Sequence, residues 1–168
     1  FNGTLYGLLL FMLSSGLTLI FSMMGVLNFA HASFFMLGAY FAYTITKFVG
    51  FWPAFVFAPL FVGILGAGVE RYGLRTVHKS GHVAELLFTF GLFYLFEELV
   101  QMVWGKVPVP YEIPESLDFP LFVWFGLEYS AYRVFMIFAS LGIMVSLYWL
   151  IARTRVGLII QAALTHPN

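Results

Sequence analysis

Residues 5–24 read LYGLLLFMLSSGLTLIFSMM, a run of twenty residues without a charged side chain. As a helix, about 20 such residues span the roughly 30 Å hydrocarbon core of a bilayer. The run lacks the strict apolar–polar alternation of strands in a membrane β-barrel. Because backbone groups in lipid must be hydrogen-bonded within the protein, the run predicts a membrane-spanning helix.

Four further apolar segments of similar length follow the first. The chain is 61% hydrophobic and 10% charged, whereas a soluble domain usually carries about 25% charged residues. We therefore predict an all-α membrane protein, a polytopic bundle of about five spans forming one transmembrane domain over residues 1–168. The predicted spans are residues 5–24, 32–48, 52–69, 83–104 and 134–152, and residues 105–133 form an external segment. Residues 121–125 and 128–134 are expected to pair as a short hairpin.

Charge and cysteine content exclude several classes of function. The formal net charge is 0, so no basic field indicates nucleic-acid binding, and without cysteines there are no disulfides or thiolate metal sites. The sequence contains no phosphate-binding Walker loop. The first residue is Phe and a polar stretch follows the last apolar segment, so we expect an N-terminal fragment of a longer protein.

The distribution of Lys and Arg predicts the orientation in the membrane. Arg71, Arg75 and Lys79 lie in the connection 70–82, and Arg153 and Arg155 follow the last span. Basic connections face the cytoplasm, whereas the segment 105–133 carries an excess of acidic residues. We therefore expect the N-terminus outside, the segment 105–133 outside and the C-terminus inside.

Asn28 and His31 lie in a break between the first two spans, where no charged residue flanks them. Asn28 could cap the following helix in a tight turn. Alternatively, the break could be a buried, irregular element beside a translocation path. A catalytic His31 is not indicated, because no Ser, Cys or acidic residue lies at a recognisable spacing.

Polar side chains also lie inside the predicted spans. Ser14 and Thr18 share a helix face and could either bond to neighbouring helices or line a path for a solute. Glu97 and Gln101 share a face of the fourth span, and Glu98 points about 100° away. These acids could reach the external interface, bond to other helices or act in a proton relay. His78 and His82 have no third ligand nearby, so no zinc site is predicted.

Three stretches resemble segments of the branched-chain amino acid ABC transporter permease family. They are residues 25–40 (GVLNFAHASFFMLGAY); Glu70-Arg71 with Leu74-Arg75 and residues 86–91; and residues 153–157 (RTRVG) with Gln161-Ala162. They occur in the family's order and at its spacing. Ala32 and Gln161 depart from its commonest residues, Gly and Arg.

The resemblance implies the N-terminal half of a membrane subunit of an ATP-driven importer for branched-chain or other hydrophobic amino acids, in a bacterial or archaeal inner membrane. It implies two cytoplasmic ATP-binding subunits, a second permease subunit and an external substrate-binding protein. It also implies no enzymatic activity and no cofactor on this chain, with ATP used by the partner. The rival hypothesis is an ion- or proton-coupled carrier that uses Glu97 and Glu98.

The candidate site residues fall into two sets. The substrate-pathway set is Ser14, Thr18, Asn28, His31, Glu97 and Gln101. The set that would contact the ATP-binding subunit is Arg71, Arg75, Arg153, Arg155, Gly157, Ile160 and Gln161. In the second set, the segment 155–165 carries an apolar stripe that includes Ile160, which could seat a coupling helix or lie on the membrane surface.

Overall fold

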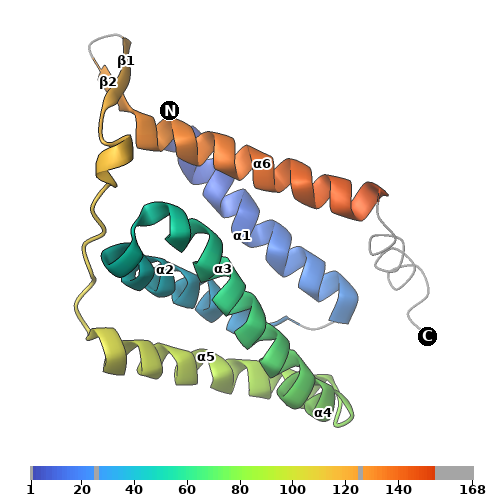
Figure 1. Cartoon of the computed structure of the whole chain (residues 1–168). Helices are drawn as coiled ribbons and strands as arrows, with labels where there is room; N and C mark the ends of the chain where they lie inside the picture. The colour runs from blue at the N-terminus through green and yellow to red at the C-terminus, as the bar shows by residue number, and fades with distance from the viewer. Residues whose placement is uncertain (1, 25–26, 125–126, 154–168) are drawn as a thin grey trace. The chain divides into compact units, whose positions relative to one another are not determined.

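The computed structural model describes residues 2–24, 27–124 and 127–153 (Figure 1). Among these residues, five helices are long and apolar enough to cross a membrane, which confirms the predicted number of spans. They are α1 (Asn2–Met24), α2 (Ala30–Val49), α3 (Phe51–Gly68), α5 (His82–Trp104) and α6 (Ala131–Arg153). Two compact units make up the chain: Met24–Tyr111 form one, and Phe1–Met23 with Glu112–Asn168 form the other.

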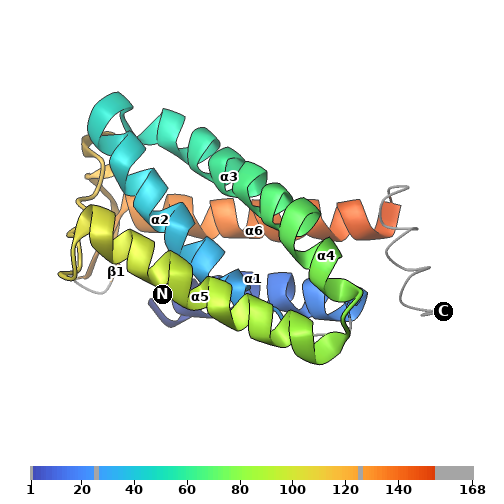
Figure 2. The ribbon, with the colours of Figure 1, turned by 90° about the horizontal axis from the view of Figure 1, so that it is seen from below.

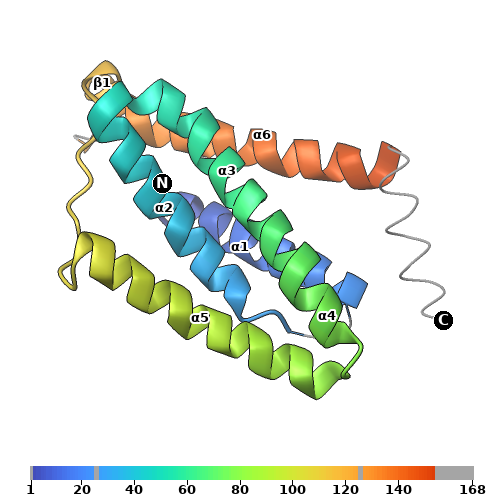
Figure 3. The same cartoon turned by 60° about the horizontal axis from the view of Figure 1, so that its bottom comes forward.

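In the unit Met24–Tyr111, α2 packs against both α3 and α5 (Figures 2 and 3). One cluster of buried hydrophobic residues in this unit comes from α2 and α5 and consists of Ala30, Leu37, Leu92, Phe96 and Val100. Gly38 lies where α2 meets α3, and a Cβ there would be in ordinary van der Waals contact with Val62 Cγ2, at 3.7 Å. Small side chains at such positions let membrane helices pack closely.

The helix that contains α3 continues well past the predicted end of its span. A π-helical segment, η1 (Val69–Leu74), and a short helix, α4 (Arg75–His78), extend it without a break. The connection 70–82 between the third and fourth predicted spans is therefore helical over Glu70–His78. Charged residues end the apolar run but do not interrupt helical hydrogen bonding; the turn comes at Gly81, whose φ is +95°.

The second unit contains α1, a short 3₁₀ helix η2 (Glu115–Leu117), a hairpin and α6. The hairpin pairs β1 (Pro120–Trp124) with β2 (Leu127–Ser130) in antiparallel register, with Trp124 opposite Leu127. The sequence predicted a second strand from 128 to 134, but it ends at Ser130. The N–H of Ala131 donates to the carbonyl of Phe119 at 2.9 Å, and α6 begins there.

Candidate substrate pathway and coupling surface

Asn28 forms the turn that starts α2. Its side chain is only 7% exposed, and its Oδ1 accepts a hydrogen bond from the N–H of Ala30 at 3.0 Å. The N–H of His31 donates to the Asn28 carbonyl at 3.2 Å. The first N–H groups of a helix have no partner within the helix, and a polar side chain that accepts from them is a cap. The structure thus shows the capping role for Asn28; a role in the pathway stays a prediction.

Polar and aromatic contacts join α2 to α5 along their length. Ser33, 1% exposed, donates from Oγ to the carbonyl of Phe93 at 3.4 Å. Further along both helices, Trp104 Nε1–H donates to Thr44 Oγ1 at 2.9 Å. The residue with the higher number in α2 pairs with the residue with the higher number in α5, so the two helices run parallel. Sequence reasoning missed these contacts, since Ser33 and Thr44 read as ordinary small residues of a span.

Glu97 and Gln101 form a pair within α5. Gln101 Nε2–H donates to Glu97 Oε1 at 3.4 Å, Glu97 is half-buried, and Glu98 is exposed. The ring of Phe29 packs against that of Phe90, with centroids 5.7 Å apart, and Glu97 lies seven residues, or about 10 Å, further along the helix. The structure therefore does not bring Glu97 and Gln101 together with the Asn28–His31 turn.

Ser14 and Thr18 are exposed on α1, and the Thr18 hydroxyl donates to the Ser14 carbonyl at 2.8 Å. Neither residue lines the apolar groove of about 490 Å³ that lies between α1 and α6. Ser15, beside them, does line it, together with residues such as Gly16 and Tyr148. The part of Ser14 and Thr18 in a pathway therefore stays a prediction.

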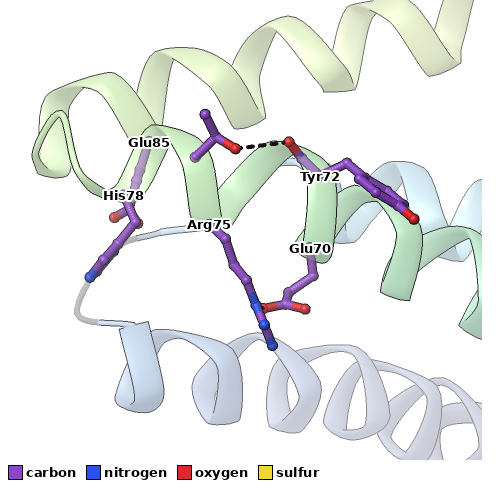
Figure 4. A network of polar contacts seen from close by, with 6 residues as sticks. Glu70, Tyr72, Arg75, His78 and Glu85 are labelled. Atoms are coloured by element: carbon purple, nitrogen blue, oxygen red, sulfur yellow. Dashed lines mark hydrogen bonds and ion pairs between the residues drawn. The ribbon is translucent and has the colours of Figure 1, made fainter.

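The helical extension η1–α4 displays charged side chains (Figure 4). Arg75 Nε–H donates to Glu70 Oε1 at 2.7 Å, and both side chains are largely exposed. The guanidinium of Arg71 lies 5.9 Å from the centroid of the Tyr72 ring. The predicted contact residues Arg71 and Arg75 therefore lie together, on a helix and not on a loop.

Glu85 is a buried acid that sequence reasoning missed. It is 1% exposed in the first turn of α5, and its Oε1 pairs with Nδ1 of His78 at the end of α4. Nδ1 of His82 lies 3.7 Å from the other oxygen, Oε2, which has no hydrogen-bond partner among the described residues. From the sequence alone, an acid in the first turn of a helix is expected to be solvated and to interact favourably with the helix dipole. Only the fold reveals that it is enclosed.

The remaining predicted residues are placed only in part. Arg153 ends α6 and is exposed. Arg155, Gly157, Ile160 and Gln161 lie outside the described residues. Within ranges 2–24, 27–124 and 127–153, no group of three or more His, Asp or Glu side chains is arranged to hold a metal ion.

Comparison with known proteins gives a consistent result. The profile of a family described as the permease component of the branched-chain amino acid transport system matches residues 1–168. The chain is 26% identical to the probable branched-chain amino acid transport permease protein LivH of Methanocaldococcus jannaschii, over 98% of this chain and 53% of that protein. It is 21% identical to the high-affinity branched-chain amino acid transport system permease protein BraD of Pseudomonas aeruginosa, over 93% of this chain and 55% of that protein.

The LivH permease of Escherichia coli K12 is 25% identical over 63% of this chain and 38% of its own length. The chain thus spans about half the length of the curated relatives that match it almost throughout. No solved structure matches it significantly. Five apolar helices and a family match over every residue lead to one conclusion: this chain is a multi-pass membrane protein and belongs to the family of branched-chain amino acid transport permeases.

Proposed function

We propose that this chain forms part of the transmembrane permease of an ATP-driven importer for branched-chain or other hydrophobic amino acids. The observation that carries the proposal is the family match over all 168 residues, supported by relatives whose names specify branched-chain amino acid transport. The permease would lie in a bacterial or archaeal inner membrane.

The energy for transport would come from cytoplasmic ATP-binding subunits, because the sequence has no Walker loop of its own. A second permease subunit and an external substrate-binding protein would complete the importer. The segment with Gly157, Ile160 and Gln161 would contact the ATP-binding subunit, with Arg153 and Arg155 near its start. ATP-driven closure would then move the helices between inward-open and outward-open arrangements.

Two features of the described residues suit such a movement. The parallel pair α2–α5 is bonded at two levels, from Ser33 to Phe93 and from Trp104 to Thr44, and so can move as one body. The Asn28 side chain caps the start of α2, so the N–H of Ala30 is not left unpaired there. The path itself would pass near this turn, lined by polar groups that include His31.

Reconstitution tests the proposal. The full-length permease, its ATP-binding subunits and its binding protein are placed in proteoliposomes, and ATP hydrolysis is measured. We expect leucine-loaded binding protein to stimulate hydrolysis well above the rate with empty binding protein. Hydrolysis that is indifferent to leucine, isoleucine and valine would contradict the proposed substrate class.

A further inference from the structure

The side of α5 that points away from α2 also has the residue spacing of a helix–helix contact. The side that packs on α2 includes Leu92 and Phe96, and a shift of two residues along a helix turns a side chain by about 200°. The shifted positions follow one another at intervals of four and three residues, as in the seam between two helices. We call them, together with Glu98, the second face of α5: Val83, Leu87, Phe90, Tyr94, Glu97 and Gln101.

The second face changes from apolar to polar along the helix. Its first half is apolar and exposed, at Val83, Leu87 and Phe90. Its second half is polar, at Tyr94, Glu97, Glu98 and Gln101. Among the residues that the structure describes, the exposed Glu98 makes no hydrogen bond or ion pair. Its neighbour Glu97 accepts a hydrogen bond from Gln101 at 3.4 Å, although a carboxylate has room for about four.

Glu98 lies well inside the length of α5. The helix has 23 residues and is about 35 Å long, against a hydrocarbon core of about 30 Å. His82 and Glu85 make its first turn polar, so the surplus length lies at that end. Glu98 precedes the last residue, Trp104, by six positions, or about 9 Å. A carboxylate at this depth is unfavourable among acyl chains and is expected to face protein or water.

Neither acyl chains nor a water-filled path suits the whole second face. Acyl chains would cover its apolar half well, but they would leave Glu98 without a hydrogen-bond donor. Water would solvate Glu98, but it would also wet the apolar half, which is unfavourable in proportion to the apolar area. A neighbouring helix satisfies both halves if it is apolar over most of its length and carries one donor side chain level with Glu98.

The relatives of this chain contain additional sequence for such a helix. LivH of Methanocaldococcus jannaschii and BraD of Pseudomonas aeruginosa are nearly twice as long, since the match covers 53% and 55% of them. We propose that the second face of α5 contacts a membrane-spanning helix from the part of the permease that corresponds to the unmatched portion of these relatives, and that this helix donates a hydrogen bond to Glu98. The inference depends on the family and the membrane, and not on the proposed use of ATP.

A spin label on the second face distinguishes protein, lipid and water. Tyr94→Cys is made in the full-length permease; residues 1–168 contain no other cysteine, and any cysteine elsewhere is replaced by serine. The labelled permease is placed singly in nanodiscs. We expect an immobile label that is protected both from oxygen, which dissolves in lipid, and from a water-soluble nickel chelate. Lys106→Cys, just beyond α5, is the control and should be accessible to the nickel chelate.

Three results would overturn the proposed contact. A label at position 94 that is accessible to oxygen would assign the second face to lipid, and one that is accessible to the nickel chelate would assign it to a water-filled path. Protection that appears only when a second permease subunit is added would place the occupant on another chain.

Glu98→Leu tests the hydrogen bond. Among acyl chains leucine is more favourable than glutamate, so a lipid-facing position would keep or raise the midpoint of thermal unfolding in detergent. If a helix donates to Glu98, leucine leaves that buried donor unpaired. We therefore expect a lower midpoint and a more mobile label at position 94. Glu98→Gln keeps an acceptor oxygen and should recover most of the loss.

Glu112→Leu is the matched control, since it removes an exposed acid outside the spans; it should keep the parent's midpoint. A Glu98→Leu midpoint equal to or above that of the parent would overturn the donated hydrogen bond. A Glu98→Gln protein as unstable as Glu98→Leu would also overturn it, because an acceptor oxygen would then make no difference.

Discussion

Replacing Asn28 by Ala removes the acceptor for the N–H of Ala30. Ala30 is 1% exposed, so water cannot readily replace the lost oxygen. A buried donor without a partner costs about 1–3 kcal/mol, and loss of a helix cap about 0.5–2 kcal/mol. The two ranges describe the same lost bond and overlap between about 1 and 2 kcal/mol, which corresponds to a roughly 5- to 30-fold change in the folding equilibrium.

The assay is reversible unfolding of the full-length permease in detergent, with uptake measured per folded molecule. Asn28→Ser is the matched control: serine keeps an acceptor oxygen and is a comparable cap, so its stability should lie within about 0.5 kcal/mol of the parent. Ala and Ser variants that unfold alike, both at the parent's midpoint, would refute the capping argument. Reduced uptake by a fully folded Asn28→Leu protein would add the predicted pathway role.

Three further predictions concern other parts of the chain. Trp104→Phe removes the hydrogen bond to Thr44 and should lower stability in detergent by about 1 kcal/mol; equal stability would mean that the bond is replaced. Gly73→Ala forces the Phe88 ring to move and should destabilise the protein by about 1–3 kcal/mol, and Phe88→Leu in the same chain should recover part of it. Ser80→Cys should be labelled by an impermeant thiol reagent only from the cytoplasmic side, and labelling from outside would reverse the predicted orientation.

The spans were predictable because each is a long apolar run, and the hydrophobic effect of the bilayer determines where such runs lie. The ends of the helices were harder to predict. Residues 70–78 look like a loop by charge, yet a helix tolerates charged side chains once it leaves the hydrocarbon, and only Gly81 stops it. The hairpin was predicted, but its second strand was drawn too long, since Tyr132 and Val134 suit a strand and a membrane helix equally well.

The candidate site was less predictable than the fold. The sequence singled out Asn28, and the structure shows its cap. Glu85 and Ser33 escaped notice because burial depends on which helices pack together, and residue type does not reveal that. The predicted pathway and contact residues stay predictions, and four of the contact residues lie outside the described residues.

The most direct test of the account is a change of driving force. Uptake of labelled leucine is measured in proteoliposomes that hold the full-length permease with its ATP-binding subunits. The binding protein is supplied on the side of the membrane from which leucine is taken. One sample receives ATP without a proton gradient, and the other a proton gradient without ATP. We predict uptake only with ATP, and a Glu97→Gln/Glu98→Gln variant should still show no uptake driven by the gradient alone. Uptake driven by the gradient alone, and abolished in that variant, would contradict an ATP-driven importer and establish a proton-coupled carrier.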